Sequence, residues 1–401
     1  MNKGIVRYVL GRMMLIEAGL MVFPLLIGLI YGESIRTVGS FLLTIGSLAA
    51  PGLLIGLKKP ESTRFYTKEG LVIAALSWLL LSVFGSLPFI FSGEIMSPAD
   101  AFFETASGFT TTGSSILTDV EAMSQSMLFW RSFTHLIGGM GVLVLALAVL
   151  PATSSESVHI MKAEVPGPTF GKLVSKLKNT ARILYIIYLV MTAVLIVLLM
   201  AGGMNWFDAS LHAFGAAGTG GFSIKATSVL YYNSAYLDIV LGIAMLVFGV
   251  NFYVYHLILI RQAKKALKNE ELRWYLIIVF AAIALICIDL FGQYDTVPRM
   301  VRDVFFSVSS VITTTGYTTA DFGSWPLFSQ AVLLLLMFIG ACAGSTGGGL
   351  KISRVAVLLK AAVADIRHAK EPKQIVPTRF EGQTLGDAET RAIGRYFLVY
   401  T

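Results

Sequence analysis

The chain has 401 residues, of which 55% are hydrophobic and only 14% are charged, and it carries a formal net charge of +7. Soluble domains carry about 25% charged residues, so this composition excludes an ordinary water-soluble protein, and its hydrophobicity excludes a disordered chain. The two cysteines, Cys287 and Cys342, lie inside apolar stretches, which indicates neither a disulfide framework nor a cysteine-based metal site.

Long apolar runs recur along the whole sequence. A helix that crosses a bilayer needs about 20 mostly apolar residues. Runs of this kind lie near residues 11–31, 37–57, 70–91, 127–151, 183–203, 235–260, 274–292 and 327–343, and a ninth opens near residue 394. The predicted fold class is therefore an all-α polytopic membrane protein.

Most of the 31 lysines and arginines lie in alternate connections between these runs. The basic segments are residues 3–12, 58–68, 162–182, 261–273 and 351–395. Because basic residues mark the cytoplasmic side of a membrane protein, we predict a cytoplasmic N-terminus. The positive charge is then a topology signal and not a nucleic-acid footprint. The opposite connections lean acidic, which would favour an approaching cation.

Three connections on the non-cytoplasmic side share one pattern. In each, an aspartate is followed at offset 11 by a threonine and at offset 13 by a glycine: Asp100, Thr111 and Gly113; Asp208, Thr219 and Gly221; Asp303, Thr314 and Gly316. The segment between aspartate and threonine is too short to cross the bilayer. We predict three half-spanning helices that begin with the aspartate as N-cap and point their negative C-terminal ends into the membrane.

Each half-spanning helix would end in a turn of threonine and glycine at membrane depth. Backbone carbonyls that leave a helix there must be buried or line a water-filled path, and rings of such carbonyls replace the hydration shell of potassium. The predicted potassium ligands are Thr111, Thr112, Gly113, Thr219, Gly220, Gly221, Thr314, Thr315 and Gly316. The alternative is that the three segments are re-entrant structural turns without an ion path.

Four short motifs stand out, at residues 109–113 (FTTTG), 219–223 (TGGFS), 313–317 (TTTGY) and 340–351 (GACAGSTGGGLK). They resemble the motifs of the Trk/Ktr/HKT superfamily of potassium transporters, and within it those of the TrkH/TrkG branch. The two apolar runs before the first repeat favour this branch over the shorter KtrB branch. The resemblance implies four helix–pore loop–helix units around one pseudo-fourfold pore, with Gly113, Gly221 and Gly316 as three of its filter glycines.

The same resemblance divides the chain into five parts. They are two N-terminal transmembrane helices in residues 1–60, pore repeats in 61–160, 161–268 and 269–372, and, in 373–401, a cytoplasmic linker with the first helix of a fourth repeat. No fourth threonine–glycine loop follows residue 316. We therefore expect either a fragment of a longer product or a truncated protein.

A glycine-rich break follows the last long apolar run, and it consists of Gly344, Ser345, Thr346, Gly347, Gly348 and Gly349. Its spacing does not fit a phosphate-binding loop. Each glycine inside a helix costs about 1 kcal/mol relative to alanine, so we predict that the helix breaks here. The family resemblance implies that residues 343–350 form an intramembrane gate under the filter. A close-packing loop at the cytoplasmic end of the helix is the alternative.

A few polar residues lie inside or beside the apolar runs. Glu104, His212 and Ser307 occupy equivalent offsets in the three predicted half-helices, and we expect them to pack behind the filter or to tune the ion path. Glu17 closely follows a basic segment, so an interfacial position is expected. His135 lies near a run of glycines and is expected to be a polar group at a helix-packing contact.

The predicted function is potassium uptake across the cytoplasmic membrane through a carbonyl-lined selectivity filter, as the pore-forming subunit of a Trk-type system. The alternative is a truncated, non-conducting paralogue that acts as an assembly or interaction subunit. The sequence shows no paired catalytic constellation, so an enzyme is not predicted, and potassium is the only expected bound species besides membrane lipid. The resemblance also implies a homodimer in the bacterial inner membrane and a TrkA-like, nucleotide-binding regulatory subunit on the cytoplasmic face. No nucleic acid and no organic cofactor are expected.

Overall fold

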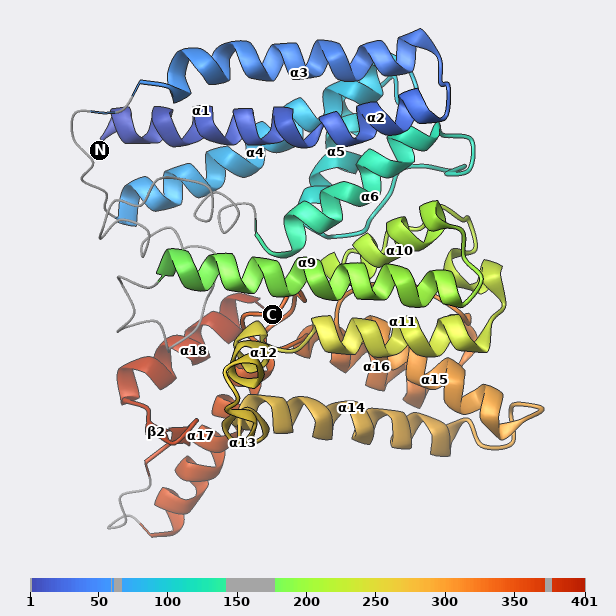
Figure 1. The fold of residues 1–401 in the computed structure, drawn as a ribbon. Coiled ribbons are helices and arrows are strands. Elements are labelled where there is room, and N and C mark those ends of the chain that lie inside the picture. Colours follow the sequence, from blue (N-terminus) through green and yellow to red (C-terminus); the bar gives the residue numbers. More distant parts are fainter. Residues whose placement is uncertain (1, 59, 61–66, 142–176, 372–376, 401) are drawn as a thin grey trace. The chain divides into compact units, whose positions relative to one another are not determined.

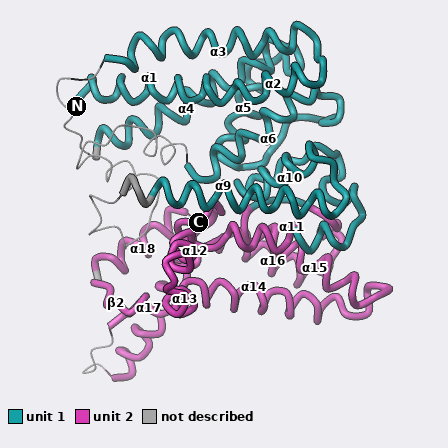
Figure 2. Tube along the Cα trace, viewed as in Figure 1, with its two compact units in different colours: residues 1–240, 315–317 teal, residues 241–314, 318–401 magenta. Residues whose placement is uncertain are grey.

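The computed structural model describes residues 2–58, 60, 67–141, 177–371 and 377–400 and is almost entirely helical (Figure 1). It divides into two compact units, which are Met1–Val240 with Thr315–Tyr317 and Leu241–Thr314 with Thr318–Thr401 (Figure 2). The predicted all-α class is confirmed by this helix content.

The first unit combines long apolar helices with short ones. Its elements are α1 (Lys3–Leu20), α2 (Val22–Ile30), α3 (Ile35–Gly56), α4 (Thr67–Ser92), α5 (Pro98–Phe109), α6 (Gln125–Gly139), α9 (Leu177–Ala201), α10 (Trp206–Gly218), the 3₁₀ helix η1 (Ser228–Tyr232) and the first part of α11 (Ala235–Phe248). Two glycines bring α1 and α3 together, since a Cβ on Gly11 would lie 2.6 Å from the backbone nitrogen of Gly56. Small residues at such contacts let helix backbones approach closely in a membrane.

The second unit begins within α11. It continues with α12 (Phe252–Leu259), α13 (Ala263–Leu267), α14 (Glu270–Asp289), α15 (Val297–Ile312), the 3₁₀ helix η2 (Phe322–Ser324), α16 (Leu327–Ile339), α17 (Ile352–Lys370), β1 (Arg379–Phe380), β2 (Gln383–Thr384) and α18 (Asp387–Tyr400). Its core joins three of these helices, through Tyr275 and Val279 of α14, Val304 and Val308 of α15 and Leu333 of α16.

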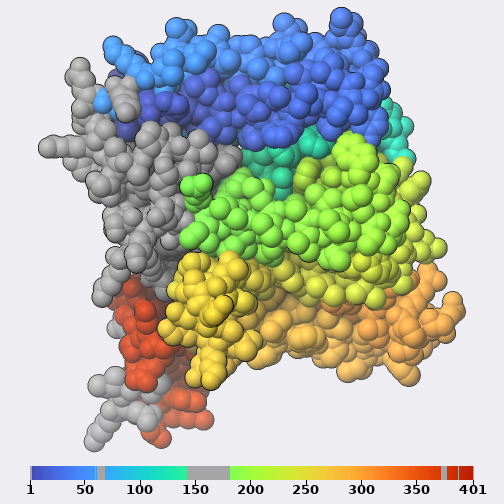
Figure 3. All heavy atoms as spheres, in the orientation of Figure 1, coloured from blue at the N-terminus to red at the C-terminus, as the bar shows by residue number. Residues whose placement is uncertain are grey.

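Among the described residues, five helices are long and apolar enough to cross a membrane. They are Lys3–Ile30, Ile35–Gly56, Lys68–Ser92, Ala181–Ala201 and Glu270–Asp289. These helices expose apolar side chains. In α3, for example, Leu43 and Leu54 are 66% and 81% exposed. The residues of α3 form part of the blue surface in Figure 3. Extended exposed apolar surface of this kind suits lipid rather than water. The apolar runs predicted near residues 11–31, 37–57, 70–91, 183–203 and 274–292 thus form helices of spanning length.

The span predicted at 235–260 is wrong as a single helix, because α11 and α12 meet at a bend of 90°. Residues between them cause the break. Gly249 packs so closely that a Cβ there would lie 2.7 Å from the Tyr275 hydroxyl oxygen. Asn251 then caps α12 by accepting the backbone N–H of Tyr253 at 2.9 Å, which starts a new helix.

Two further predicted spans are shorter in the structure or lie partly outside it. The run at 327–343 holds only the 13-residue α16, which ends at Ile339 where the glycine-rich segment begins. The run at 127–151 contains α6, but its second half lies outside the described residues. The predicted repeat boundary at 160–161 and the basic residues 162–176 lie outside them as well.

A short hairpin occupies part of the predicted linker, where β1 and β2 pair antiparallel. Its turn residues, Glu381 and Gly382, have φ of +51° and +73°, as a tight type I′ turn requires. The Glu381 carboxylate also accepts the backbone N–H groups of Glu270 and Glu271 at 2.8 and 3.1 Å. The hairpin therefore caps the N-terminal end of α14.

Glu17 does not lie at a membrane interface, so that expectation is wrong. Together α1 and α2 form one span of 28 residues, and Glu17 lies near its middle. The side chain is 1% exposed. A glycine on α4 makes room for it, since a Cβ on Gly85 would lie 3.2 Å from Glu17 Oε1.

Candidate functional site

Three short helices contain the predicted repeat: α5, α10 and α15, with 12, 13 and 16 residues. They do not begin with the predicted aspartates. Ser97 and Asn205 cap α5 and α10 by accepting the backbone N–H of Asp100 and Asp208, which lie in the first turn. Asp303 lies in the second turn of α15. The aspartate N-cap prediction is wrong because serine and asparagine are equally good caps, while an acid inside the first turn still complements the helix dipole.

Each of these helices ends in the same unusual backbone conformation. The φ angles are +55°, +54° and +60° at Thr111, Thr219 and Thr314, and +77°, +73° and +90° at Gly113, Gly221 and Gly316. A β-branched residue at positive φ is rare and strained. Because the strain occurs at the same offset three times, the sequence repeat is also a repeat in backbone geometry, and strain of this kind clusters at functional sites.

The turns after the three helices lie against one another. Residues 112–113, 220–221 and 315–316, here called the three arms, all belong to the first unit. A Cβ placed on Gly113 would overlap the Gly220 carbonyl oxygen, and one on Gly221 would overlap the Thr315 carbonyl oxygen. A carbonyl of the second arm thus packs against the glycine of the first, and a carbonyl of the third arm packs against the glycine of the second. A Cβ on Gly316 would meet no described atom within 4 Å, so this glycine faces open space.

Behind the first two arms, a side chain of the short helix binds the segment that leaves the arm. Glu104 of α5 accepts hydrogen bonds from Ser115 Oγ at 2.9 Å and from the Ile116 backbone N–H at 3.0 Å. His212 of α10 lies at the equivalent offset, with its Nε2 3.3 Å from Ser223 Oγ. Glu104, His212 and the equivalent Ser307 of α15 are all buried. Two of these three residues thus bind the segment that follows an arm.

Arg131 of α6 is a functional candidate that the sequence reasoning missed. Its Nε lies 2.5 Å from Glu104 Oε1, and its Nη1 donates to the Ser223 carbonyl at 3.0 Å. Its guanidinium carbon also lies 3.5 Å from the centre of the Phe222 ring. The two charged side chains are almost fully buried, so the pair connects the segments after the first and second arms. A lone arginine inside a predicted span is the signal that could have identified it.

Aromatic side chains add further links among the arms. The Tyr317 hydroxyl, next to the third arm, lies 3.1 Å from the carbonyl oxygens of both His212 and Phe222 and can donate to either. His135 is fully buried and stacks on Phe222, with ring centres 4.1 Å apart. The same ring would lie 2.5 Å from a Cβ on Gly220. His135 therefore occupies the packing position expected from the sequence.

Residues 340–351, between α16 and α17, form a loop that contains the predicted break at 344–349 and begins earlier, at Gly340; we call it the glycine-rich loop. Its ends, Gly340 and Lys351, both have positive φ, +73° and +81°. The loop folds back on itself, because a Cβ on Gly349 would lie 2.5 Å from the Gly340 Cα and one on Gly340 would overlap the Gly348 carbonyl. Inside the loop, Lys351 Nζ donates to the Gly347 carbonyl. Glycine is required at the pinch because backbone meets backbone there.

The loop contacts the end of α15 and the bend between α11 and α12. Gly348 N–H donates to Thr314 Oγ1 at 2.7 Å, and Thr314 directly precedes the third arm in the chain. At the bend, Cys342 N–H donates to the Gly249 carbonyl at 3.1 Å. Two more bonds join Thr346 Oγ1 to the Phe248 carbonyl and Phe252 N–H to the Gly344 carbonyl. The two helix breaks therefore satisfy each other's backbone groups, as the interior of a membrane demands.

A buried carboxylate holds both ends of this loop. Glu271, near the start of α14, is 4% exposed and accepts the backbone N–H groups of Ala343 at 2.8 Å and Ser353 at 3.2 Å. Glu271 does not stand out in the sequence, because residues 261–273 form a basic connection there and the apolar run begins at residue 274. Its position in the first turn of a spanning helix became visible only with the helix boundary.

The arms offer oxygen atoms rather than a cluster of metal-binding side chains. In the ranges that the structure describes, no group of three or more His, Cys, Asp and Glu side chains could hold a metal ion. Backbone carbonyls and threonine hydroxyls are instead the ligands that strip water from an alkali cation. The three arms present backbone carbonyls of this type, at Gly220 and Thr315 among others.

Comparison with known proteins identifies the family. The family model described as TrkH, a cation transport protein, matches residues 41–401. The Trk system potassium uptake protein TrkH of Halomonas elongata is 31% identical over 407 residues, covering 100% of this chain and 84% of that protein. The Trk system potassium uptake protein TrkH of Escherichia coli K12 is 32% identical over 401 residues, covering 98% of this chain and 82% of that protein.

A solved structure extends the similarity to the fold. The crystal structure of the potassium transporter TrkH from Vibrio parahaemolyticus matches with a TM-score of 0.88 at 28% sequence identity, covering 99% of this chain and 83% of that chain. The chain therefore belongs to the TrkH family of cation transport proteins, and it is a multi-pass membrane protein.

Proposed function

We propose that this chain carries potassium ions across the cytoplasmic membrane as the pore-forming subunit of a Trk-type uptake system. The observation that supports this most directly is the packing of the three arms, in which the Gly220 carbonyl meets Gly113 and the Thr315 carbonyl meets Gly221. The names of the relatives, which are potassium uptake proteins, support the choice of ion.

The ion is held by oxygens of the nine residues predicted from the sequence: Thr111, Thr112, Gly113, Thr219, Gly220, Gly221, Thr314, Thr315 and Gly316. Three threonines at positive φ turn successive carbonyls away from the helix ladder. The oxygens then replace the hydration shell of the ion. The C-terminal ends of α5 and α10, both in the first unit, contribute partial negative charge in support.

Residues 344–349 of the glycine-rich loop act as the gate of this path. It is bonded to Thr314 through Gly348, so a movement of the loop reaches the residue that precedes the third arm. The Glu271 carboxylate holds both ends of the loop, which sets its resting position. The loop bends where Gly340 and Gly349 lie in close backbone contact, so its bending is concentrated at residues without a side chain.

The proposed topology places the N-terminus in the cytoplasm of a bacterial cell and the arms near the outer side. Pore repeats at 61–160, 161–268 and 269–372 surround the pore, and residues 373–401 hold a cytoplasmic linker and the first helix of a fourth. Basic connections on the cytoplasmic side support this orientation. A homodimer and a TrkA-like regulatory subunit on the cytoplasmic face complete the proposed system, in line with relatives that are named for a Trk system.

Growth at low potassium tests this function. The chain is expressed in a strain that lacks its own potassium uptake, together with a variant in which Gly221 is replaced by alanine. We expect the chain to restore growth and rubidium uptake, and the Gly221→Ala variant to fail. A chain that reaches the membrane intact but supports no uptake would contradict conduction and favour the alternative role as an assembly or interaction subunit.

A further inference from the structure

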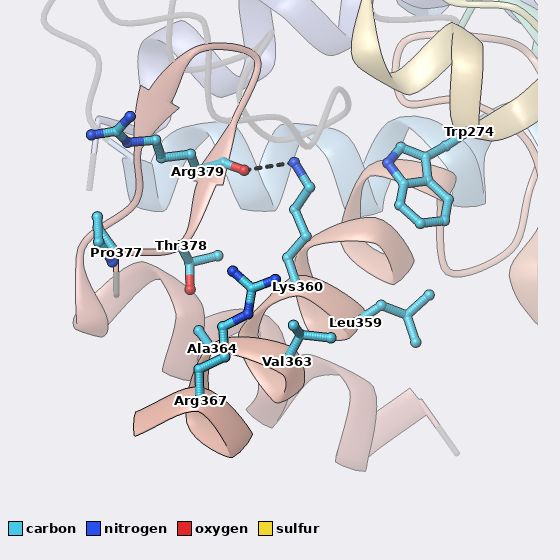
Figure 4. Close-up of a pocket in the computed structure, with 9 residues that line it drawn as sticks. All are labelled: Trp274, Leu359, Lys360, Val363, Ala364, Arg367, Pro377, Thr378 and Arg379. Atoms are coloured by element: carbon cyan, nitrogen blue, oxygen red, sulfur yellow. Dashed lines mark hydrogen bonds between the residues drawn. The ribbon is translucent and has the colours of Figure 1, made fainter. Parts of the chain in front are cut away.

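A hollow of about 350 Å³ lies in the second unit between α17, β1 and the first turns of α14 (Figure 4). Its walls combine cationic and apolar side chains. The cations are Lys360, Arg367 and Arg379, and the main apolar groups are Trp274, Leu359 and Val363. The role proposed above for the arms and the loop involves none of these side chains.

Two of the three cations lack an acidic partner. Lys360 Nζ binds the Glu270 carboxylate and also donates to the Arg379 carbonyl at 2.8 Å. Within the described ranges, no acidic side chain pairs with the guanidinium of Arg367 or Arg379. Figure 4 shows the Arg367 guanidinium between Thr378 and Lys360. The hollow therefore carries uncompensated positive charge that would attract an anion.

Apolar side chains beside the hollow are exposed in a pattern that suits lipid. Leu359, Val363 and Ile366 of α17 are 50%, 48% and 59% exposed and recur at the spacing of one helix face. Trp274 lies near the beginning of the α14 span, and tryptophan at the end of a span marks the headgroup level of the bilayer. A helix with an apolar stripe bordered by basic residues at this level binds the membrane surface.

We propose that the hollow binds the phosphate group of an anionic phospholipid. The arginine guanidinium forms paired hydrogen bonds to phosphate oxygens, and the stripe of Leu359, Val363 and Ile366 supplies the surface for the acyl chains. A soluble phosphate compound could use the same cations, but it would leave the stripe exposed to water. The position of the hollow beside a spanning helix favours the lipid.

Lipid retention on the purified full chain tests this site. The chain is isolated in a mild detergent, mixed with phosphatidylglycerol or with neutral phosphatidylcholine, and examined by native mass spectrometry. We expect selective retention of phosphatidylglycerol. The double variant Arg367→Gln with Arg379→Gln should weaken it about 30-fold, which corresponds to about 1 kcal/mol for each basic residue near an anionic surface. Both side chains are exposed, so the fold should persist.

A matched control removes the same charge elsewhere in the second unit, through Lys264→Gln with Lys265→Gln, two exposed residues of α13. Retention should be unchanged in this control. Equal losses in both double variants would overturn the site, because they would reflect net charge alone. Inorganic phosphate that displaces the lipid without the help of an acyl chain would overturn the lipid assignment. A dimer in which a second copy covers the stripe of Leu359, Val363 and Ile366 would also overturn it. Such a dimer would form with rising protein concentration and would exclude the lipid.

Discussion

The three arms and the glycine-rich loop are both irregular backbone between helices, but they are fixed in different ways. Buried charged and aromatic side chains hold the segments next to the arms: Arg131 and Glu104 form an ion pair, and the Tyr317 hydroxyl bonds to the Phe222 carbonyl, which follows the second arm. The loop is held by backbone hydrogen bonds, by the hydroxyl groups of Thr314 and Thr346, and by the Glu271 carboxylate. An ion pair between two buried side chains links segments far apart in the sequence, whereas the loop is linked mostly through single hydrogen bonds to its backbone.

The largest effect is expected where an arm tolerates no side chain at all. In Gly221→Ala, the new Cβ would overlap the Thr315 carbonyl oxygen, and φ of +73° would also be strained. We expect rubidium uptake into proteoliposomes to be lost. The matched control is Gly292→Ala, where φ is +87° but a Cβ meets no described atom within 4 Å. If both variants lost uptake equally, backbone strain and not the packing of the arms would explain the effect.

The next largest effect is expected at the buried ion pair. Arg131→Gln leaves the Glu104 carboxylate buried without its cation, which costs about 3–5 kcal/mol. Thermal unfolding in detergent should show the loss of stability. The variant should also take up potassium with less preference over sodium. The double variant with Glu104→Gln should recover part of the stability, since no unpaired charge remains. A double variant that is less stable than Arg131→Gln would contradict the pairing.

The arms could be predicted from the sequence because the same residue types recur at the same offsets in all three repeats. Threonine and glycine recur at the same places, and the structure shows the same φ angles at Thr111, Thr219 and Thr314. The links between arms could not be predicted. Arg131 reaches a carbonyl 92 residues away in the sequence, and nothing local to Arg131 encodes that contact.

Of the two helix breaks, one could be predicted from the local sequence and the other could not. The break after α16 could be predicted, since six successive residues are glycine, serine or threonine. The bend at Gly249 could not, because the apolar composition of 235–260 is the same for a straight span and a bent one. The bend depends on the fit of Tyr275 against Gly249 and on the bond from Cys342, which are tertiary contacts.

A smaller effect is expected where the loop is tied to α14. Glu271→Ala would leave the buried N–H groups of Ala343 and Ser353 without an acceptor, at about 1–3 kcal/mol each. We expect the loop to leave its resting position more easily and the basal ion flux to rise. Glu271→Gln retains an acceptor oxygen and should restore part of the wild-type behaviour.

The neighbouring acid provides the control for this loop variant. Glu270 bonds to Lys360 and to the backbone of Glu381, not to the loop. Glu270→Gln should therefore leave the flux unchanged. A rise in flux of equal size in both variants would show that α14 as a whole has shifted, and the specific link between Glu271 and the loop would be abandoned.

The smallest effect is expected at an exposed ion pair that joins the same two segments as Arg131. Lys225 Nζ lies 2.8 Å from Glu121 Oε2. The hydrogen bond from Lys225 lowers the pKa of Glu121 from its ordinary 4.5, and the bond to Glu121 raises the pKa of Lys225 from its ordinary 10.5. Water and salt screen such a pair, so its contribution to stability should be small.

The sign of each shift fixes the pH range of that contribution. A lowered carboxyl pKa stabilises the folded state above pH 4.5, and this is lost as the pH falls through the folded-state pKa. A raised lysine pKa stabilises below pH 10.5, and this is lost as the pH rises through the folded-state pKa. The melting temperature of Glu121→Gln should therefore lie slightly below that of the unmodified chain at neutral pH and meet it in acid. A neutral-pH difference as large as that of Arg131→Gln would show that burial does not separate the two pairs.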